Sequence, residues 1–184
     1  MKALVVLASL FLLTSGQAVA QTRPYRGEVF AGAGGARVGG DEGSLGSGPC
    51  IVVGLGFRFT TRASVELDLL RAQHDRDIAG GPLEGTATGV FGEIVYHFSE
   101  GRVQVFVVGS AGLLNSKTTH RYPAGGSAIV FRSHNNDLAW GGGGGVKIFL
   151  APHLSLRPQL RLVFSEATGV MGLTAASVAV GYHW

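Results

Sequence analysis

Apolar and polar residues alternate at every second position along most of this chain, which is the pattern of β-strands with one apolar and one polar face. The clearest case is Leu154 to Phe164, where the even positions are apolar and the odd positions are mostly polar. A helix with this sequence would spread its arginines around the whole circumference, so the alternation predicts a strand. The last segment, Thr174 to Trp184, repeats the pattern.

Six further segments alternate in the same way, which makes eight predicted strands in all. They cover 27–33, 51–59, 65–69, 90–98, 103–114 and 138–150. The segment 103–114 is apolar on both faces and 27–33 is weakly patterned, so the register of these two strands stays open.

Short and long connections alternate strictly between these predicted strands. The short ones are 60–62, 99–102 and 151–153, and the long ones are 34–49, 74–85, 115–136 and 165–172. In outer-membrane barrels the periplasmic turns are short and the extracellular loops are longer. Because the first connection is long, both ends of an eight-stranded chain fall on the periplasmic side. The sequence therefore predicts an all-β, antiparallel, up-and-down transmembrane barrel of eight strands.

Alternation alone does not say which face is outside, since a soluble lipocalin-like barrel turns its apolar face inward. The aromatic residues favour the membrane. Those on the apolar face near the predicted periplasmic end are Phe57, Phe59, Tyr96, Phe98, Tyr182 and Trp184, while Trp140 and Phe164 lie near the other end. Two aromatic belts around an aliphatic band are typical of a bilayer. A soluble periplasmic carrier with an apolar cavity is the alternative.

The first twenty residues are predicted to be a cleaved signal peptide. Lys2 supplies the positive charge, 3–13 the apolar region, and Ala18-Val19-Ala20 the cleavage pattern. A short buried helix is the other interpretation, and the run is too short to span a membrane, which takes about 20 residues. We expect the mature barrel domain to be 21–184.

The composition narrows the function classes. Only 15% of the residues are charged, against about 25% in an ordinary soluble domain, and the formal net charge is +3. A small net charge and export argue against a nucleic-acid partner. Cys50 is the single cysteine, which excludes an intramolecular disulfide framework and a cysteine-based metal cluster.

The carboxyl terminus carries a recognisable pattern. Alternate residues of the last strand are apolar or aromatic up to the final position: Val178, Val180, Tyr182 and Trp184. With the glycine-rich strand 141–150, Pro152 and the alternating strand 154–164, this end resembles the small OmpA/OmpX-like outer-membrane barrel domains. The resemblance implies that the terminal strand is read by the barrel assembly machinery. It also implies a role as an adhesin, a surface-exposed structural protein or a protein of unknown role.

If the apolar face meets lipid, the polar face lies in the lumen. It carries four acids and four bases: Glu28, Glu66, Asp68, Glu93, Arg58, Lys147, Arg157 and Arg161. Eight strands leave a lumen just wide enough for side chains to fill, and buried charges are costly unless paired. The sequence therefore predicts a salt-bridged plug. A narrow passive pore is the alternative.

We expect no catalytic site, no cofactor and no metal. Some small outer-membrane barrels are lipid A enzymes that use a serine, a histidine and a carboxylate. The candidate stretch is 131–137, but Ser133 adjoins His134 and would point to the opposite face of a strand. The run 141–145 is all glycine and lacks the lysine and hydroxyl residue of a phosphate loop. A lipid A-modifying enzyme is kept as an alternative.

The connection 115–136 is basic, with Lys117, Arg121 and Arg132 and no acid. Arginine forms bidentate pairs with phosphate, so these residues are candidates for contact with lipopolysaccharide. Ordinary solvation is the other explanation. We expect a monomer whose partners are outer-membrane lipid, lipopolysaccharide and, during biogenesis, the assembly machinery; the sequence does not identify a further surface ligand.

Overall fold

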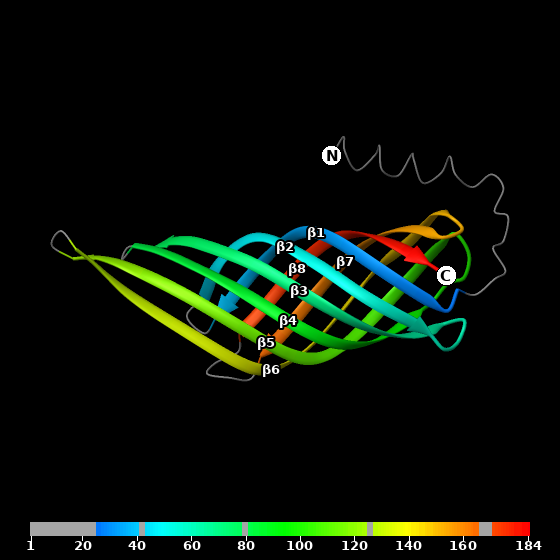
Figure 1. Cartoon of the computed structure of the whole chain (residues 1–184), viewed down its shortest axis with the longest axis horizontal. Helices are drawn as coiled ribbons and strands as arrows, with labels where there is room; N and C mark the ends of the chain where they lie inside the picture. Colours follow the sequence, from blue (N-terminus) through cyan, green and yellow to red (C-terminus); the bar gives the residue numbers. More distant parts are fainter. Residues whose placement is uncertain (1–24, 41–42, 79–80, 125–126, 166–170) are drawn as a thin grey trace.

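The computed structural model describes residues 25–40, 43–78, 81–124, 127–165 and 171–184. These residues form one closed antiparallel barrel in which each strand pairs with its neighbours in the sequence and β1 pairs with β8 (Figure 1). The strands are β1 (Gly27–Gly40), β2 (Gly43–Arg58), β3 (Ala63–Ile78), β4 (Gly81–His97), β5 (Val103–Ala124), β6 (Ser127–Ala151), β7 (Leu154–Ser165) and β8 (Met171–His183).

The predicted strand order and the eight-stranded barrel are confirmed. The predicted signal peptide, 1–20, lies outside the described residues. Within the part of the chain that the structure describes, no helix has both the length and the hydropathy of a membrane span.

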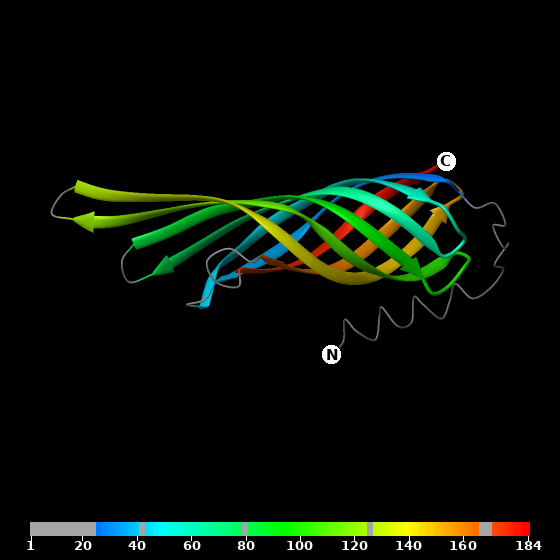
Figure 2. The ribbon, with the colours of Figure 1, turned by 90° about the horizontal axis from the view of Figure 1, so that it is seen from below.

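Three of the connections predicted as long loops, 34–49, 74–85 and 115–136, are largely strand where the structure describes them, whereas most of the fourth, 165–172, lies outside the described residues. β5 continues to Ala124 and β6 begins at Ser127, so most of 115–136 is paired hairpin. β1 likewise continues to Gly40, and β3 to Ile78. The prediction was wrong here because the outward residues of these extensions lie beyond the apolar band, so the alternation that marks the lipid-facing strands is weak, although inward residues such as Val38 are buried. Figures 1 and 2 show that the β5–β6 hairpin reaches farthest beyond the barrel.

The two faces of each strand differ as predicted. On β3, Val65, Leu67 and Leu69 are 41–55% exposed on the outside, whereas Glu66 and Asp68 between them are buried. The residues predicted to form the aromatic belts also point outward; Phe57, Tyr182 and Trp184, for example, are more than half exposed. The apolar face of the barrel is therefore its outer surface, and the polar face lines the lumen.

Candidate functional sites in the lumen and on the outer hairpin

All eight charged residues predicted to face inward lie in the lumen, and none is more than 8% exposed. Alternation places them there, because residues two apart on a strand share a face. Arg161 on β7 forms ion pairs with Asp68 on β3 and with Glu93 on β4, the latter at 2.8 Å between Nη2 and Oε1. Lys147 on β6 pairs with Glu28 on β1. The pairs thus connect strands from opposite walls of the barrel.

Arg157 lies at the centre of this network and is fully buried. Its Nη1 donates to Glu66 Oε2 at 2.7 Å and lies 3.9 Å from Glu28 Oε1. Its guanidinium carbon lies 4.4 Å from the ring centre of Phe30 and 4.6 Å from that of Phe106. One cation therefore contacts two carboxylates and two aromatic rings.

Arg58 differs from the other three bases, because within the described residues it forms no ion pair. Its Nη2 donates to Gln104 Oε1 at 2.9 Å, and its guanidinium lies 4.3 Å from the ring centre of Tyr25. Tyr25 also accepts a hydrogen bond from Lys147 Nζ at 3.2 Å and packs 4.2 Å from the His183 ring. Tyr25 precedes β1, outside any alternating segment, so the strand pattern gave no sign of it.

His97 and His183 are further lumen residues that the sequence analysis did not select. Both are essentially fully buried, and their positions on the polar faces of β4 and β8 were a usable signal. His183 Nε2 lies 2.7 Å from Ser155 Oγ, while its Nδ1 lies 3.9 Å from Glu28.

A second, apolar layer fills the lumen on the side of the long hairpins. Its larger members are buried side chains from seven strands: Phe30, Val38, Val52, Leu70, Phe91, Leu114, Val163 and Leu173. Two glycines make room for its rings, since a Cβ on Gly54 would lie 2.3 Å from the Phe30 ring, and one on Gly89 2.3 Å from the Phe91 ring. The sequence analysis predicted only the charged part of the interior.

The three basic residues proposed for lipopolysaccharide contact share one face of the β5–β6 hairpin. Thr119 pairs with Arg132, Lys117 with His134, and Arg121 with Val130. Directly opposed residues lie on the same side of a sheet, and diagonal neighbours are about 7–8 Å apart. Arg132 is therefore the diagonal neighbour of both other bases, and the three form a compact cluster, which we call the basic face.

The basic face continues the outer surface of the barrel. Below it on the same side, Asn115 Nδ2 donates to Asn136 Oδ1 and lies 3.1 Å from His134 Nε2. Next come Leu113 and Leu138, which are 63% and 71% exposed. Going outward, the surface thus changes from apolar to amide to cationic.

Neighbouring strands add acids that the hairpin itself lacks. Arg121 lies 3.9 Å from Glu84 on β4, and both side chains are more than half exposed. A groove of about 410 Å³ beside the basic face is lined by Lys117, Asp75 and Glu84, among others. Within the described residues, Lys117 and Arg132 form no ion pair, so these two cations are available to an external anion.

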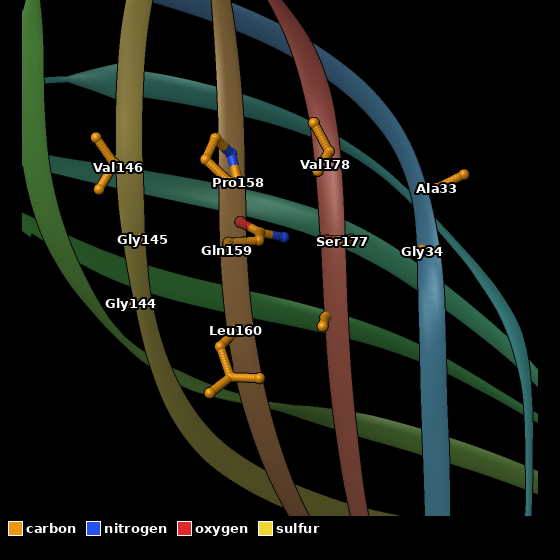
Figure 3. A pocket seen from close by; sticks show the side chains of 11 residues that line it. Ala33, Gly34, Gly144, Gly145, Val146, Pro158, Gln159, Leu160, Ser177 and Val178 are labelled. Carbon is orange, nitrogen blue, oxygen red and sulfur yellow. The ribbon is translucent and has the colours of Figure 1, made fainter. Parts of the chain in front are cut away.

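The glycine run of β6 has no side chains, which leaves a depression in the outer surface of the barrel. A shallow apolar groove of about 500 Å³ lies over Gly144 and Gly145, beside Pro158 and Leu160 of β7 and Val178 of β8 (Figure 3). A Cβ on Gly145 would lie 2.3 Å from the Pro158 carbonyl oxygen and 2.8 Å from the Phe106 ring. The run therefore has a packing role, in agreement with its lack of phosphate-loop residues.

Comparison with known proteins gives one family. The model of the outer membrane protein beta-barrel domain matches residues 3–183. No curated protein matches the chain.

Solved structures with a similar fold include three outer-membrane or surface proteins. Neisserial surface protein A has a TM-score of 0.65 and 17% identity over 86% of this chain and 97% of that one. Ail of Yersinia pestis, in complex with the heparin analogue sucrose octasulfate, has a TM-score of 0.61 and 13% identity over 88% of this chain and 100% of that one. A major outer membrane protein of Thermus thermophilus has a TM-score of 0.63 and 15% identity over 88% of this chain and 100% of that one. At these identities the likeness concerns the fold.

Proposed function

Because the chain belongs to the outer membrane protein beta-barrel domain family and is an outer-membrane barrel, we propose that it is a non-enzymatic surface protein with a closed lumen. We propose further that its basic face binds the phosphates of lipopolysaccharide. The observation that carries this function is the position of Lys117, Arg121 and Arg132 on one face that continues the outer wall.

The arrangement of the outer wall matches the layers of a lipopolysaccharide molecule. Strands rise about 3.4 Å per residue, so Lys117 lies roughly 14 Å along β5 from Leu113. Acyl chains would pack on Leu113 and Leu138, and phosphates above them would meet Lys117 and Arg132. Charge-assisted hydrogen bonds to arginine are strong and geometrically specific. A solvated surface would not need its cations clustered directly above the apolar band.

Two features support a closed lumen. The charged layer is cross-linked between strands by ion pairs such as Arg161–Asp68 and Arg157–Glu66. The apolar layer above it, with Phe30 and Phe91 fully buried, offers ions no polar contacts. Dehydrating an ion in such surroundings is very costly, so we expect the protein not to conduct.

A non-enzymatic role is supported by the placement of the candidate nucleophiles. Ser133 and His134 are adjacent on β6 and lie on opposite faces. Ser155 and His183 do meet, at 2.7 Å, but both are fully buried in the lumen and out of reach of a substrate. An unchanged mass of lipid A after expression of the protein is the expected result, and loss or gain of an acyl chain would contradict it.

Titration of purified lipopolysaccharide into the refolded barrel tests the basic face. Arg121→Ala combined with Arg132→Ala is expected to weaken binding at least tenfold, since each lost charged hydrogen bond costs about 1.5–3 kcal/mol. Arg26→Ala is the control, because this exposed arginine lies at the other end of the barrel beside Trp184. Dephosphorylated lipopolysaccharide should bind weakly to the unchanged protein, and sucrose octasulfate should compete. Unchanged affinity of the double variant would refute the assignment.

Planar bilayer recording tests the lumen. The unchanged protein should give no steady channel. Large, sustained open-channel currents would overturn the closed lumen and favour the passive pore. Phe30→Ala with Phe91→Ala, which removes both rings of the apolar layer, should be the variant most prone to leak.

A further inference from the structure

A groove on the outer surface carries charges of both signs beside the basic face. Its volume is about 410 Å³, and its charged lining residues are Asp75 on β3, Glu84 on β4 and Lys117 on β5. Asp75 lies directly opposite Glu84. In the same row across the sheet, Thr119 follows on β5 and Arg132 on β6. The row therefore runs from acidic at β3 to basic at β6.

The two acids of this row have little positive charge near them. Like charges directly opposite each other destabilise a sheet. Among the residues that the structure describes, Asp75 forms no ion pair, and Glu84 forms one only with Arg121, at 3.9 Å between two largely exposed side chains. Such exposed pairs contribute little to stability. Both carboxylates are therefore available to a cation from outside.

A buried acceptor without a donor lies at the floor of the groove. His74, which also lines the groove, is 2% exposed. Its Nδ1 lies 3.3 Å from the carbonyl oxygen of Leu45, so Nδ1 is the donor of the neutral ring and Nε2 is an acceptor. Nε2 has no hydrogen-bond partner in the described ranges, and a Cβ on the lining residue Gly85 would lie 2.3 Å from it. Because a buried polar atom without a partner is costly, the floor, like the rim, points to a ligand with N–H donors.

The group that these acceptors fit best is an ammonium. A primary ammonium has three N–H donors and no acceptor, and its hydrogen bonds to carboxylates are charge-assisted. A divalent metal ion fits less well, since Ca²⁺ takes about six to eight oxygen ligands and the described residues contain no group of three or more histidine, cysteine, aspartate or glutamate side chains that could hold one. Gln73 and Thr86, which lie opposite each other in the groove, add amide and hydroxyl oxygens.

The cation at the other side of the groove requires an anion on the same ligand. Lys117 is a diagonal neighbour of Glu84, about 7–8 Å away. The two acids repel a simple phosphate at Lys117, whereas a phosphate esterified with a short amine such as ethanolamine places its positive charge over them. The order of charges along the groove therefore matches a phosphate that carries an amine.

We propose that the groove selects lipopolysaccharide in which a phosphate carries an amine. The ammonium lies between Asp75 and Glu84, and the phosphate lies at Lys117. The inference rests on the proposed binding of lipopolysaccharide by the basic face and adds a preference for one chemical form of it. Lipopolysaccharide is the source of the group because the groove lies beyond the apolar band, next to the proposed phosphate contacts.

The test is a titration of the refolded barrel, in detergent with a metal chelator, with two lipopolysaccharide preparations that differ only in ethanolamine on their phosphates. The ethanolamine form is expected to bind about tenfold more tightly, since its ammonium adds charge-assisted hydrogen bonds. Acetylation of the amine keeps the linker and removes the charge. The acetylated form should therefore bind no more tightly than the form without ethanolamine.

The acids are tested with a variant that keeps their shape. Asp75→Asn combined with Glu84→Gln should abolish the preference for the ethanolamine form. It should bind the form without ethanolamine at least as tightly as the unchanged protein does, because the repulsion of phosphate is removed. Asp77→Asn is the matched control, since this exposed acid of β3 does not line the groove, and it should keep the preference. A mobility shift on boiling verifies that each variant is folded.

Three results would overturn the inference. Equal binding of the two forms by the unchanged protein would remove the ammonium site, while a weakening by Arg121→Ala with Arg132→Ala would still support the phosphate contacts. Binding of neither form would remove the proposed function and the inference together. If Mg²⁺ strengthens binding of the form without ethanolamine, and the Asp75→Asn, Glu84→Gln variant abolishes that gain, the acids hold a metal ion and not an ammonium.

Discussion

Replacing Arg157 by methionine removes the cation that contacts both Glu28 and Glu66. Methionine keeps most of the volume of the side chain and leaves the rings of Phe30 and Phe106 in place. It leaves Glu66, whose side chain is fully buried, without its partner at 2.7 Å. Glu28 keeps Lys147, so the loss is concentrated on one carboxylate.

The expected magnitude follows from these contacts. Removing one partner of a buried ion pair costs about 3–5 kcal/mol, mostly because the other charge is left unpaired. The two cation–π contacts add roughly 0.5–2 kcal/mol each, and sulfur–aromatic contacts of the new methionine return about 0.3–1.5 kcal/mol each. We therefore expect Arg157→Met to lower the free energy of unfolding by about 3–5 kcal/mol.

Urea unfolding in micelles, followed by circular dichroism and by the mobility shift on boiling, measures this loss. Arg157→Met with Glu66→Gln should be more stable than Arg157→Met alone, because the unpaired charge is gone. Arg62→Met is the control; Arg62 pairs with Glu100 on the surface, with both side chains more than half exposed, and such pairs contribute about 0–1 kcal/mol. A loss below about 1 kcal/mol for Arg157→Met, or strictly additive losses in the double variant, would refute the reasoning.

Three further predictions test the packing and the polarity of the lumen. Gly54→Ala should lower the unfolding free energy by about 1–3 kcal/mol, because its Cβ would lie 2.3 Å from the Phe30 ring, while Gly109→Ala, with no atom within 4 Å, should be near neutral; equal urea midpoints would contradict this. Cys50 is 2% exposed, so a maleimide should label it only after unfolding, and rapid labelling of the folded barrel would mean that Cys50 faces outward. Burial lowers the pKa of His74, which lies above the apolar band; its contribution to stability is present above the unfolded pKa of about 6.5 and is lost as the pH falls below that value. His74→Gln should therefore weaken the fall in unfolding free energy between pH 7 and pH 5, and an unchanged slope would argue against it.

Sequence reasoning reached the parts of the fold that the bilayer dictates. Where β3 carries Val65, Leu67 and Leu69 on one side and Glu66 and Asp68 on the other, lipid and lumen impose opposite polarity, and the alternation is strong. The same contrast located the inward charges. The ion-pair partners of these charges could not be predicted, because the stagger between distant strands decides which acid lies near Arg161.

The sequence analysis missed the strand extensions and Tyr25 for a different reason. Beyond the band that faces lipid, Asp75, Arg76 and Asp77 of β3 are all exposed, so neither face is marked by apolar residues. Their strand is defined by pairing with β4, which leaves no trace in the hydropathy. Tyr25 lies at one end of the lumen, before β1 begins, and contacts Arg58, Lys147 and His183. A single residue outside the strands shows no alternation, so the sequence pattern could not identify it.

The two layers of the lumen have a common explanation in the surroundings of the wall. On β3 the outward side changes from Leu69 to Arg71 at the level where the inward side changes from Asp68 to Leu70. β5 shows the same exchange, with Leu113 followed by Asn115 outside while Leu114 is buried inside.

Below this level on β3, the outer wall is apolar and the lumen side carries Glu66 and Asp68. Above it water covers the outer wall, so an apolar interior is what stabilises the sheet, as in any soluble β-protein. The apolar layer is therefore expected wherever strands continue past the bilayer. On β3 and β5 we infer that the position where the two faces exchange polarity marks the outer membrane interface.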